Sequence, residues 1–404
     1  MLKRPVILQI DVALNVGSTG RIVHEIGDAI LKEGWMSHAA FGRYSAPSTS
    51  TAHKIGTKAD QAAHLLLTRL FDLHGKGSLG ATKRLRTLLT DLKPDVVHLH
   101  QVHGYYLHLR ELMQLLEEYG KPVVWTFHDA WQLTGHCCYF DRFDCQKWQT
   151  SCGSCPMTRY YPQSWGIDNS ASNHQEKKAT IGALSNLTIV PVSYWLGDMV
   201  KQSYLSQKPI EVIQNGVDLE QFFIEKADEA APAKAEKTTY LGVAGVWADH
   251  KGLSDFVQMS ELLRDDEQIV LIGLTEKQLN GLPANIKALP AQGSISALRQ
   301  WYNRATVFLN PSKSESFGLV TAEALACGTP AVVYNTTACP ELVDDKTGRV
   351  VAKGDFTGML YAARELAQLD SEAIQAACRN RAELHFDKQK QTNKYIQLYK
   401  QLIY

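Results

Sequence analysis

Short apolar runs that recur along the chain are the feature that most limits what it can fold into. They are rich in Val and Ile and do not alternate with polar residues. Such runs suit strands that are covered on both faces of a parallel sheet. Amphipathic stretches at 21–33 and 107–119 lie between them, and this alternation predicts doubly wound α/β units. The runs lie at 6–10, 96–99, 123–127, 187–192, 240–243, 269–272, 307–309 and 331–334.

The strand–helix pattern occurs twice, which predicts two Rossmann-like domains facing across a cleft. We expect the first domain at 1–209 and the second at 210–384. An Asn215-Gly216 turn lies at the junction, and a stretch rich in Ala and charge at 225–237 reads as a solvated linker. The last residues, 385–404, are expected to form a helix that packs back on the first domain.

Composition limits the partners of the chain. Its 404 residues contain 42 Lys plus Arg and 42 Asp plus Glu, so no net charge attracts nucleic acid. The sequence has no apolar segment of about 18 residues, the length that a membrane-spanning helix needs. The first residues lack the features of a signal peptide. We expect a cytoplasmic protein, and the sequence leaves peripheral contact with the inner membrane face open.

A segment from Glu315 to Gly328 combines two carboxylates with a predicted helix start. Pro311 ends a strand, and the helix is expected to begin near Phe317 and stop at Gly328. A helix start of this kind suits a diphosphate. Glu315 and Glu323 are eight residues apart, about 12 Å along a continuous helix, so they cannot form a close acid/base pair. Spacing alone favours a helix cap and a solvated charge.

The context of this segment resembles the donor-binding half of family 4 retaining glycosyltransferases of the GT-B fold. The similarity covers nearly the whole chain and is strongest at 210–351. It is closest to the branch that builds capsule, exopolysaccharide or colanic-acid-type chains. The matching stretches are Glu315 to Gly328, 330–333, 340–343 with Gly348, Lys251-Gly252, 215–218 and 17–21.

This resemblance implies a donor site for a UDP- or GDP-hexose. Glu315 would bind hydroxyl groups of the sugar, Glu323 the ribose, and Lys251 the diphosphate leaving group. Val246-Trp247 stand where relatives carry an arginine, so one expected cation is absent. Backbone near the phosphates and sugar would come from Gly17, Gly20, Ser316, Phe317, Gly318, Leu319 and Val320.

The same resemblance places the acceptor, a saccharide or a lipid-linked saccharide, in the first domain. His128 matches a family histidine near the reacting sugar, and His100 and Asp129 are the other candidates for the acceptor cleft. A structural histidine bonded to backbone is the alternative. His128, Lys251 and Glu315 are the expected catalytic residues. The mechanism implied is front-face displacement, with no metal or other cofactor needed for catalysis.

Five cysteines between Cys137 and Cys155 form a separate pattern. Cys152 and Cys155 have the spacing of a zinc knuckle, and Cys145 with Cys137 or Cys138 can complete a tetrahedral site. Relatives show a similar pattern, with the first cysteine at Cys137. We expect a structural Zn²⁺ on the loop 135–156. An iron–sulfur cluster, a disulfide and plain buried thiols are the alternatives.

Two other classes of function compete with hexosyl transfer in surface polysaccharide synthesis. A nucleotide-sugar epimerase or a phosphorylase would share the fold, although a phosphorylase is expected to have a longer chain. A zinc-knuckle protein that binds without catalysis belongs to another class. The neutral charge and the lack of a basic aromatic stripe oppose a nucleic-acid binder.

Overall fold

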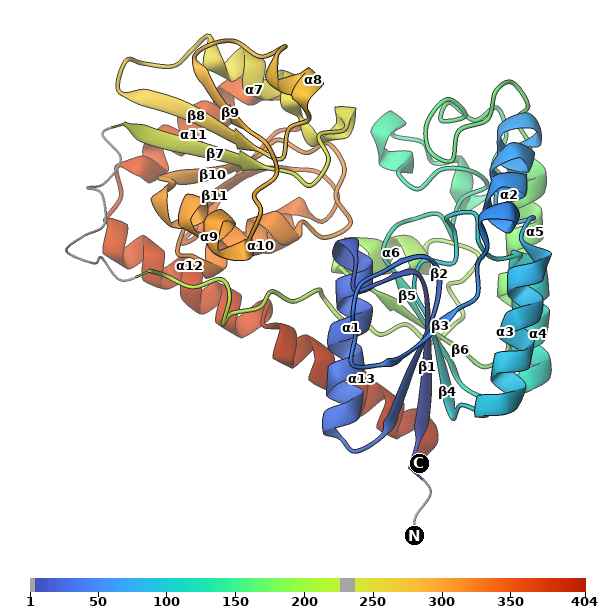
Figure 1. Cartoon of the computed structure of the whole chain (residues 1–404). Helices are drawn as coiled ribbons and strands as arrows, with labels where there is room; N and C mark the ends of the chain where they lie inside the picture. The colour runs from blue at the N-terminus through green and yellow to red at the C-terminus, as the bar shows by residue number, and fades with distance from the viewer. Residues whose placement is uncertain (1–3, 226–236) are drawn as a thin grey trace. The chain divides into compact units, whose positions relative to one another are not determined.

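The computed structural model describes residues 4–225 and 237–404 and divides into two compact units. Unit 1 comprises Met1–Ile213 and Thr392–Tyr404, and unit 2 comprises Gln214–Gln391. Each unit contains a six-stranded sheet whose neighbouring strands all run parallel (Figure 1). The predicted pair of Rossmann-like α/β units is therefore confirmed. Most of the expected linker lies outside the described residues.

Unit 1 has the strand order β3-β2-β1-β4-β5-β6. The reversal of strand order beside β1 places a switch point at the carboxyl ends of β1 and β4, where open α/β sheets bind ligands. In chain order the elements are β1 (Val6–Leu14), α1 (Gly17–Lys32), β2 (Met36–Ser45), β3 (Thr51–Lys54), α2 (Lys58–Phe71), α3 (Leu79–Leu92), β4 (Val96–Leu99), α4 (Leu109–Tyr119), β5 (Val123–Phe127), the 3₁₀ turns η1 (Phe140–Phe143) and η2 (Lys147–Gln149), α5 (Ser170–Ala183), β6 (Leu187–Pro191) and α6 (Tyr194–Lys201).

The last helix, α13 (Lys388–Ile403), covers one face of the first sheet beside α1 (Figure 1). Tyr395 and Tyr399 are fully buried there, against Ile7 and Val124 of the strands. Their hydroxyl groups contact Thr126 Oγ1 at 2.9 Å and His98 Nδ1 at 2.6 Å. The chain end thus supplies part of the core of unit 1, and His98 serves this packing.

Unit 2 repeats the plan with the strand order β12-β11-β10-β7-β8-β9. Adjacent β10 and β7 run parallel, so the loops after both strands leave the same edge of the sheet. The elements are β7 (Thr238–Val243), η3 (Asp249–Lys251), α7 (Leu253–Ser260), β8 (Glu267–Ile272), α8 (Glu276–Leu279), β9 (Ile286–Leu289), α9 (Ile295–Arg304), β10 (Val307–Asn310), α10 (Leu319–Ala326), β11 (Ala331–Tyr334), η4 (Cys339–Leu342), β12 (Gly348–Val351), α11 (Phe356–Ala367) and α12 (Ser371–His385).

All eight apolar runs form strands, but four further strands were not predicted. The missed strands are β2, β3, β9 and β12, which carry polar or small residues such as His38 and Lys287. β1 also continues to Leu14, so Asp11 lies inside a strand rather than at its end. β3, β9 and β12 are edge strands, which are covered less completely and need not be apolar throughout. β2 lies inside its sheet and is mostly buried, but its small and polar residues form no apolar run.

Within the described residues, no helix is both long and apolar enough to cross a membrane.

Candidate active site

The loops after β7 and β10 meet at the carboxyl edge of the second sheet. Gly252 has φ of +75°, and a Cβ there would lie 2.3 Å from the carbonyl oxygen of Pro311. Only glycine permits so close an approach of the two loops. The backbone N–H of Lys313 then donates to the carbonyl of His250 at 2.7 Å. These contacts hold Lys251 beside the segment that contains Glu315.

Lys251 and Glu315 form the central ion pair of this edge. Lys251 Nζ lies 2.7 Å from Glu315 Oε1, and Ser312 Oγ donates to the same oxygen at 3.0 Å. The side chains are 26% and 11% exposed, so the pair is shielded yet reachable from solvent. The backbone N–H of Glu315 donates to Thr337 Oγ1, which also fixes the main chain of this residue. The carboxylate is therefore held in one orientation before any ligand binds.

Helix α10 begins two residues later than the sequence predicts and ends at Ala326. Gly318 is its N-cap, with φ of +100°, and among the described residues no side chain caps the first turn. The free N–H groups of such a turn can donate hydrogen bonds to an anion. The ring of Phe317 packs against Phe386 and is buried. Only the backbone of Phe317 is therefore suited to contact a ligand.

Glu323 lies within α10, where Tyr302 of α9 donates a hydrogen bond to its Oε2 at 2.8 Å. Neither Tyr302 nor its bond was predicted, because no local pattern links residues on two helices. The structure thus places Glu323 as a positioned carboxylate rather than a freely solvated one. Glu315 precedes the helix, so the two carboxylates belong to different segments.

The position of the missing arginine is open to solvent. Val246 is 73% exposed, while the neighbouring Trp247 is buried and donates from Nε1 to the carbonyl of Ile272. Lys313 cannot easily replace the absent cation, because its Nζ pairs with buried Asp255 at 3.0 Å. Tyr334 donates to the other oxygen of Asp255, so this network fixes the loop after β10. Sequence reasoning missed both Asp255 and Tyr334.

In unit 1, the predicted acceptor residues lie at the carboxyl ends of β4 and β5. His128 Nε2 contacts His100 Nδ1 at 3.1 Å, and His100 Nε2 contacts Gln9 Oε1 at 3.2 Å. His100 is fully buried, whereas part of His128 remains accessible. Burial lowers the pKa of His128 to about 4, although nearby Asp129 raises it. At neutral pH its imidazole is therefore uncharged.

Asp129 faces inward rather than toward solvent. It is 3% exposed, and its Oδ2 lies 2.8 Å from Nε2 of His103, while Oδ1 accepts from the backbone N–H of Trp131. Cys138 joins His103 and Asp129 in a buried group whose potential ligand atoms lie within 4.8 Å of one another. His103 is itself buried. Of the two other candidates, His100 bonds to His128, whereas the side chain of Asp129 bonds to His103 and to the backbone of Trp131.

Gly17 and Gly20 were predicted to form the loop between β1 and α1, but both lie in the first turn of α1, and only Asn15 and Val16 separate the strand from the helix. Gly17 has φ of +70° and open space where a side chain would stand. A Cβ on Gly20 would lie 3.2 Å from the backbone nitrogen of Asn15, so glycine keeps this loop compact. Asp11 lies below the loop and accepts from the N–H of Gln101 at 3.0 Å. Burial raises the pKa of Asp11 to about 6, against the hydrogen bonds from Gln101 and Ala13.

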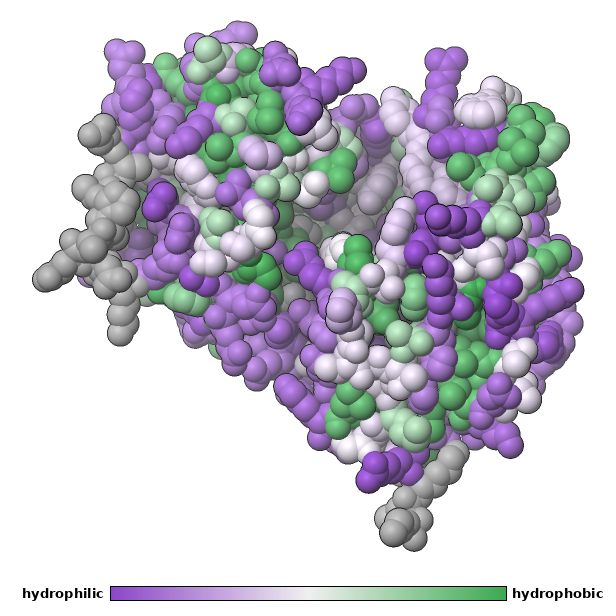
Figure 2. All heavy atoms as spheres, in the orientation of Figure 1, coloured by the Kyte–Doolittle hydropathy of each residue, from purple (hydrophilic) through white to green (hydrophobic). Residues whose placement is uncertain are grey.

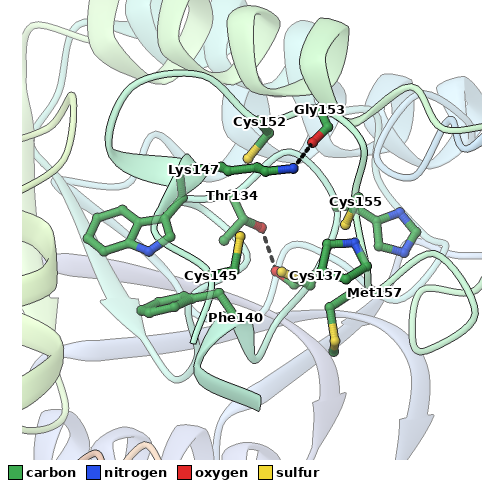
Figure 3. A pocket seen from close by; sticks show the side chains of 12 residues that line it. Thr134, Cys137, Phe140, Cys145, Lys147, Cys152, Gly153, Cys155 and Met157 are labelled. Carbon is green, nitrogen blue, oxygen red and sulfur yellow. Dashed lines mark hydrogen bonds between the residues drawn. The ribbon is translucent and has the colours of Figure 1, made fainter. Parts of the chain in front are cut away.

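The four predicted zinc ligands line one pocket in the loop between β5 and α5 (Figure 3). They are Cys137, Cys145, Cys152 and Cys155. All four are free thiols. Among the described residues no three of their sulfur atoms lie within 4.8 Å of one another. The loop brings the four thiols around one pocket, but their sulfur atoms lie farther apart than the ligands of a single metal ion would.

Two family models match the chain. The model described as Glycosyltransferase Family 4 matches residues 19–221, half of the chain, and that described as Glycosyl transferases group 1 matches 237–368. The putative colanic acid biosynthesis glycosyl transferase WcaC of Escherichia coli (strain K12) is 23% identical over 98% of this chain and 100% of its own length. The lipopolysaccharide core biosynthesis mannosyltransferase LpcC of Rhizobium leguminosarum bv. viciae is 33% identical, over 38% of this chain and 48% of its own.

Solved structures show the same fold. Sucrose-phosphate synthase from Thermosynechococcus elongatus superposes with a TM-score of 0.72 at 16% identity, over 99% of each chain. Anabaena HepE, in complex with UDP and glucose, gives a TM-score of 0.65 at 13% identity, over 98% of this chain and 99% of its own. The predicted GT-B fold and glycosyltransferase activity are thereby confirmed, and the chain belongs to glycosyltransferase family 4.

Proposed function

We propose that this glycosyltransferase moves a hexose from a UDP- or GDP-sugar to a saccharide or lipid-linked saccharide during bacterial surface polysaccharide synthesis, with retention of anomeric configuration. The observation that carries the proposal is the Lys251–Glu315 pair beside the first turn of α10. The assignment to surface polysaccharide synthesis is supported by a relative that is named for colanic acid biosynthesis and aligns with almost the whole chain. The nucleotide base and the hexose stay open.

The donor is held by two separated carboxylates. Both side-chain contacts of Glu315 use Oε1, and within the described part of the chain Oε2 makes no hydrogen bond. Oε2 is thus the atom for the sugar hydroxyl groups. Glu323, which Tyr302 holds in place, accepts a hydrogen bond from the ribose. Carboxylates accept strong directional bonds from hydroxyl groups.

Positive potential for the departing diphosphate comes from Lys251 and the α10 turn. The backbone of Ser316, Gly318, Leu319 and Val320 faces the phosphates and the sugar. The leaving phosphate oxygen helps to deprotonate the acceptor in a front-face displacement. The protein then acts by positioning and electrostatic stabilisation, and this mechanism assigns no step to a metal ion.

His128 is the acceptor-contacting residue of the three candidates in unit 1. Its partly accessible ring carries no charge at neutral pH, so it can accept or donate one hydrogen bond to a sugar hydroxyl. His100 acts through it by the contact at 3.1 Å, and buried Asp129 supports the neighbouring His103. A direct contact of these two residues with the acceptor, as the sequence suggested, is therefore not part of the proposal.

An apolar patch on unit 1 suits a lipid-linked acceptor at the cytoplasmic face of the inner membrane. Figure 2 shows hydrophobic residues gathered over α2. Trp165 is 65% exposed and lies beside α2, since its backbone N–H donates to the carbonyl of Arg69. Large exposed apolar patches commonly mark interaction sites. The exposed side chains are Leu65, Leu66, Leu70, Phe71, Trp165 and Ile167.

Incubation with a panel of UDP- and GDP-sugars tests this function. We expect one sugar nucleotide to release nucleoside diphosphate faster when a lipid-linked saccharide is added than with its water-soluble analogue. Omitting Mg²⁺ and Mn²⁺ should leave the rate unchanged, and nuclear magnetic resonance should show a product of retained configuration. Turnover that yields an epimerised sugar without an acceptor would favour the epimerase, and consumption of no donor would favour a binding protein.

A further inference from the structure

The loop between β5 and α5 surrounds a pocket rich in sulfur. Four thiols reach it from three separate stretches of the loop, and Figure 3 shows them turned toward a common space. His136 and Lys147 also line this pocket. Its thiols are those of Cys137, Cys145, Cys152 and Cys155.

This loop has little regular structure of its own. Between β5 and α5 it contains only the short turns η1 and η2. Lys147 Nζ donates to the carbonyl groups of Gly153 and Ser154, at 2.9 and 3.1 Å, and both residues have positive φ. Loops longer than about 15 residues without helices or strands are uncommon in compact domains, so an additional constraint is expected.

Hydrogen-bond donors and a buried cation face the thiols. The backbone N–H of Gly135 donates to Cys152 Sγ at 3.2 Å. Nδ1 of His136 contacts Asp72 at 2.5 Å, while its Nε2 is buried without a hydrogen-bond partner in the described structure. In metal sites a carboxylate–histidine pair of this kind holds a histidine that is itself a ligand, so His136 Nε2 is a further potential donor beside the four thiols.

Lys177 supplies the second, independent observation. Its ammonium group is buried and donates to the carbonyls of Trp131 and Thr134, at 2.6 and 2.9 Å, rather than to a carboxylate. Burial lowers the pKa of Lys177 to about 7, and nearby Cys138, followed by Cys152, opposes this shift. A buried cation is costly unless negative charge lies close by.

We propose that Cys137, Cys145, Cys152 and Cys155 bind one structural Zn²⁺ as four thiolates. Binding releases four protons and leaves a centre with a charge of −2, which Lys177 offsets. In tetrahedral zinc sites the Zn–S distance is about 2.3 Å, so sulfur atoms lie roughly 3.8 Å apart. Binding therefore draws the four sulfurs closer than they lie here, which the irregular loop permits. With four protein ligands, no position stays open for catalysis.

The metal would stabilise the acceptor side of unit 1. The backbone N–H of Ala130 donates to the carbonyl of Cys138 at 3.2 Å. Cys138 directly follows the proposed ligand Cys137, and Ala130 directly follows Asp129, so this bond links the two segments. The neighbouring group of His103, Asp129 and Cys138 is a weaker candidate for the metal. Its histidine and carboxylate already bond to each other at 2.8 Å.

Metal analysis of the full chain, expressed with zinc in the medium and purified without chelators, tests the proposal. We expect about one zinc per chain. Substitution with Co²⁺ should give the strong ultraviolet sulfur-to-cobalt absorption of a four-thiolate site. Less than about 0.2 equivalents of zinc would overturn the proposal, as would stoichiometric iron or a disulfide among the four cysteines.

Two variants separate the ligand sets. Cys152→Ser should lose the zinc, whereas the matched Cys138→Ser, in the same loop, should keep about one equivalent. Loss in Cys138→Ser with retention in Cys152→Ser would assign the metal to the His103 group and overturn the proposal. If Cys152→Ser fails to fold, titration of the wild-type chain with a mercurial reagent decides. Zinc release should then follow modification of four thiols, and release after fewer than three would contradict the site.

Discussion

Replacing Glu315 with Gln is expected to lower kcat by about 100-fold or more while leaving the affinity for nucleoside diphosphate within about twofold. The amide keeps the size of the side chain but removes the negative charge that Lys251 and Ser312 orient. It also weakens the bond that Oε2 accepts from the sugar. Steady-state rates with the donor found in the panel, together with calorimetric titration of the diphosphate, measure both quantities.

Glu276→Gln is the matched control, because Glu276 is exposed on α8 of the same unit and its loss changes the net charge equally. It should retain wild-type turnover. Thermal melting checks that Glu315→Gln folds, since leaving Lys251 unpaired costs on the order of 1 kcal/mol for a partly exposed ion pair. Turnover of Glu315→Gln within a few fold of wild type would show that the carboxylate does not bind the sugar.

Replacing Lys251 with Met should lower kcat by about 100-fold, with a smaller loss of nucleotide affinity. The arginine expected near Val246 is absent, so Lys251 carries more of the charge stabilisation at this edge. The loss should therefore be larger for transfer than for binding, because negative charge on the diphosphate grows as the sugar departs. Steady-state rates and calorimetric titration of the diphosphate, as for Glu315→Gln, measure the loss of kcat and the loss of affinity separately.

Lys251→Arg tests whether the cation itself matters and should recover part of the turnover. Lys277→Met, an exposed lysine on α8, is the matched control and should behave as wild type. Equal losses of turnover and of nucleotide affinity in Lys251→Met would mean that the lysine binds ground state and transition state alike. That result would remove Lys251 from the proposed chemistry.

The strands that hold the site could be predicted from sequence because they are buried on both faces. β7 and β10 are apolar runs, and Pro311 and Gly318 mark where the second loop starts and where α10 begins. Outer strands such as β3, with the sequence Thr-Ala-His-Lys, carry no such signal. Their assignment depends on pairing with β2, which is a long-range property.

The partners of the site residues could not be predicted for the same reason. Glu315 and Lys251 were selected separately, but their contact spans 64 positions and requires strands β7 and β10 to be neighbours. The bond from Tyr302 to Glu323 joins two helices. The inward position of Asp129 goes with its bond to His103, 26 positions away in the sequence. Residue type indicated the chemistry, while topology determined which groups meet.

Glu315 and Glu323 differ in what holds them, and this difference is central to the account. Glu315, in the loop before α10, is fixed by a lysine and a hydroxyl, and Glu323, within α10, is fixed by a tyrosine of α9. They are therefore suited to two ends of one extended ligand. Loss of either should weaken a different part of the donor.

Calorimetric titration of UDP and GDP into the wild type, Glu315→Gln and Glu323→Gln tests this claim most directly. The account predicts that Glu323→Gln lowers the affinity for the preferred diphosphate by about tenfold or more, since a ribose contact to a charged acceptor is lost, while Glu315→Gln stays within about twofold. Tyr302→Phe, which removes the tyrosine hydroxyl but keeps the carboxylate, should fall between them. Equal affinities in Glu315→Gln and Glu323→Gln would contradict the division of the donor between the two carboxylates.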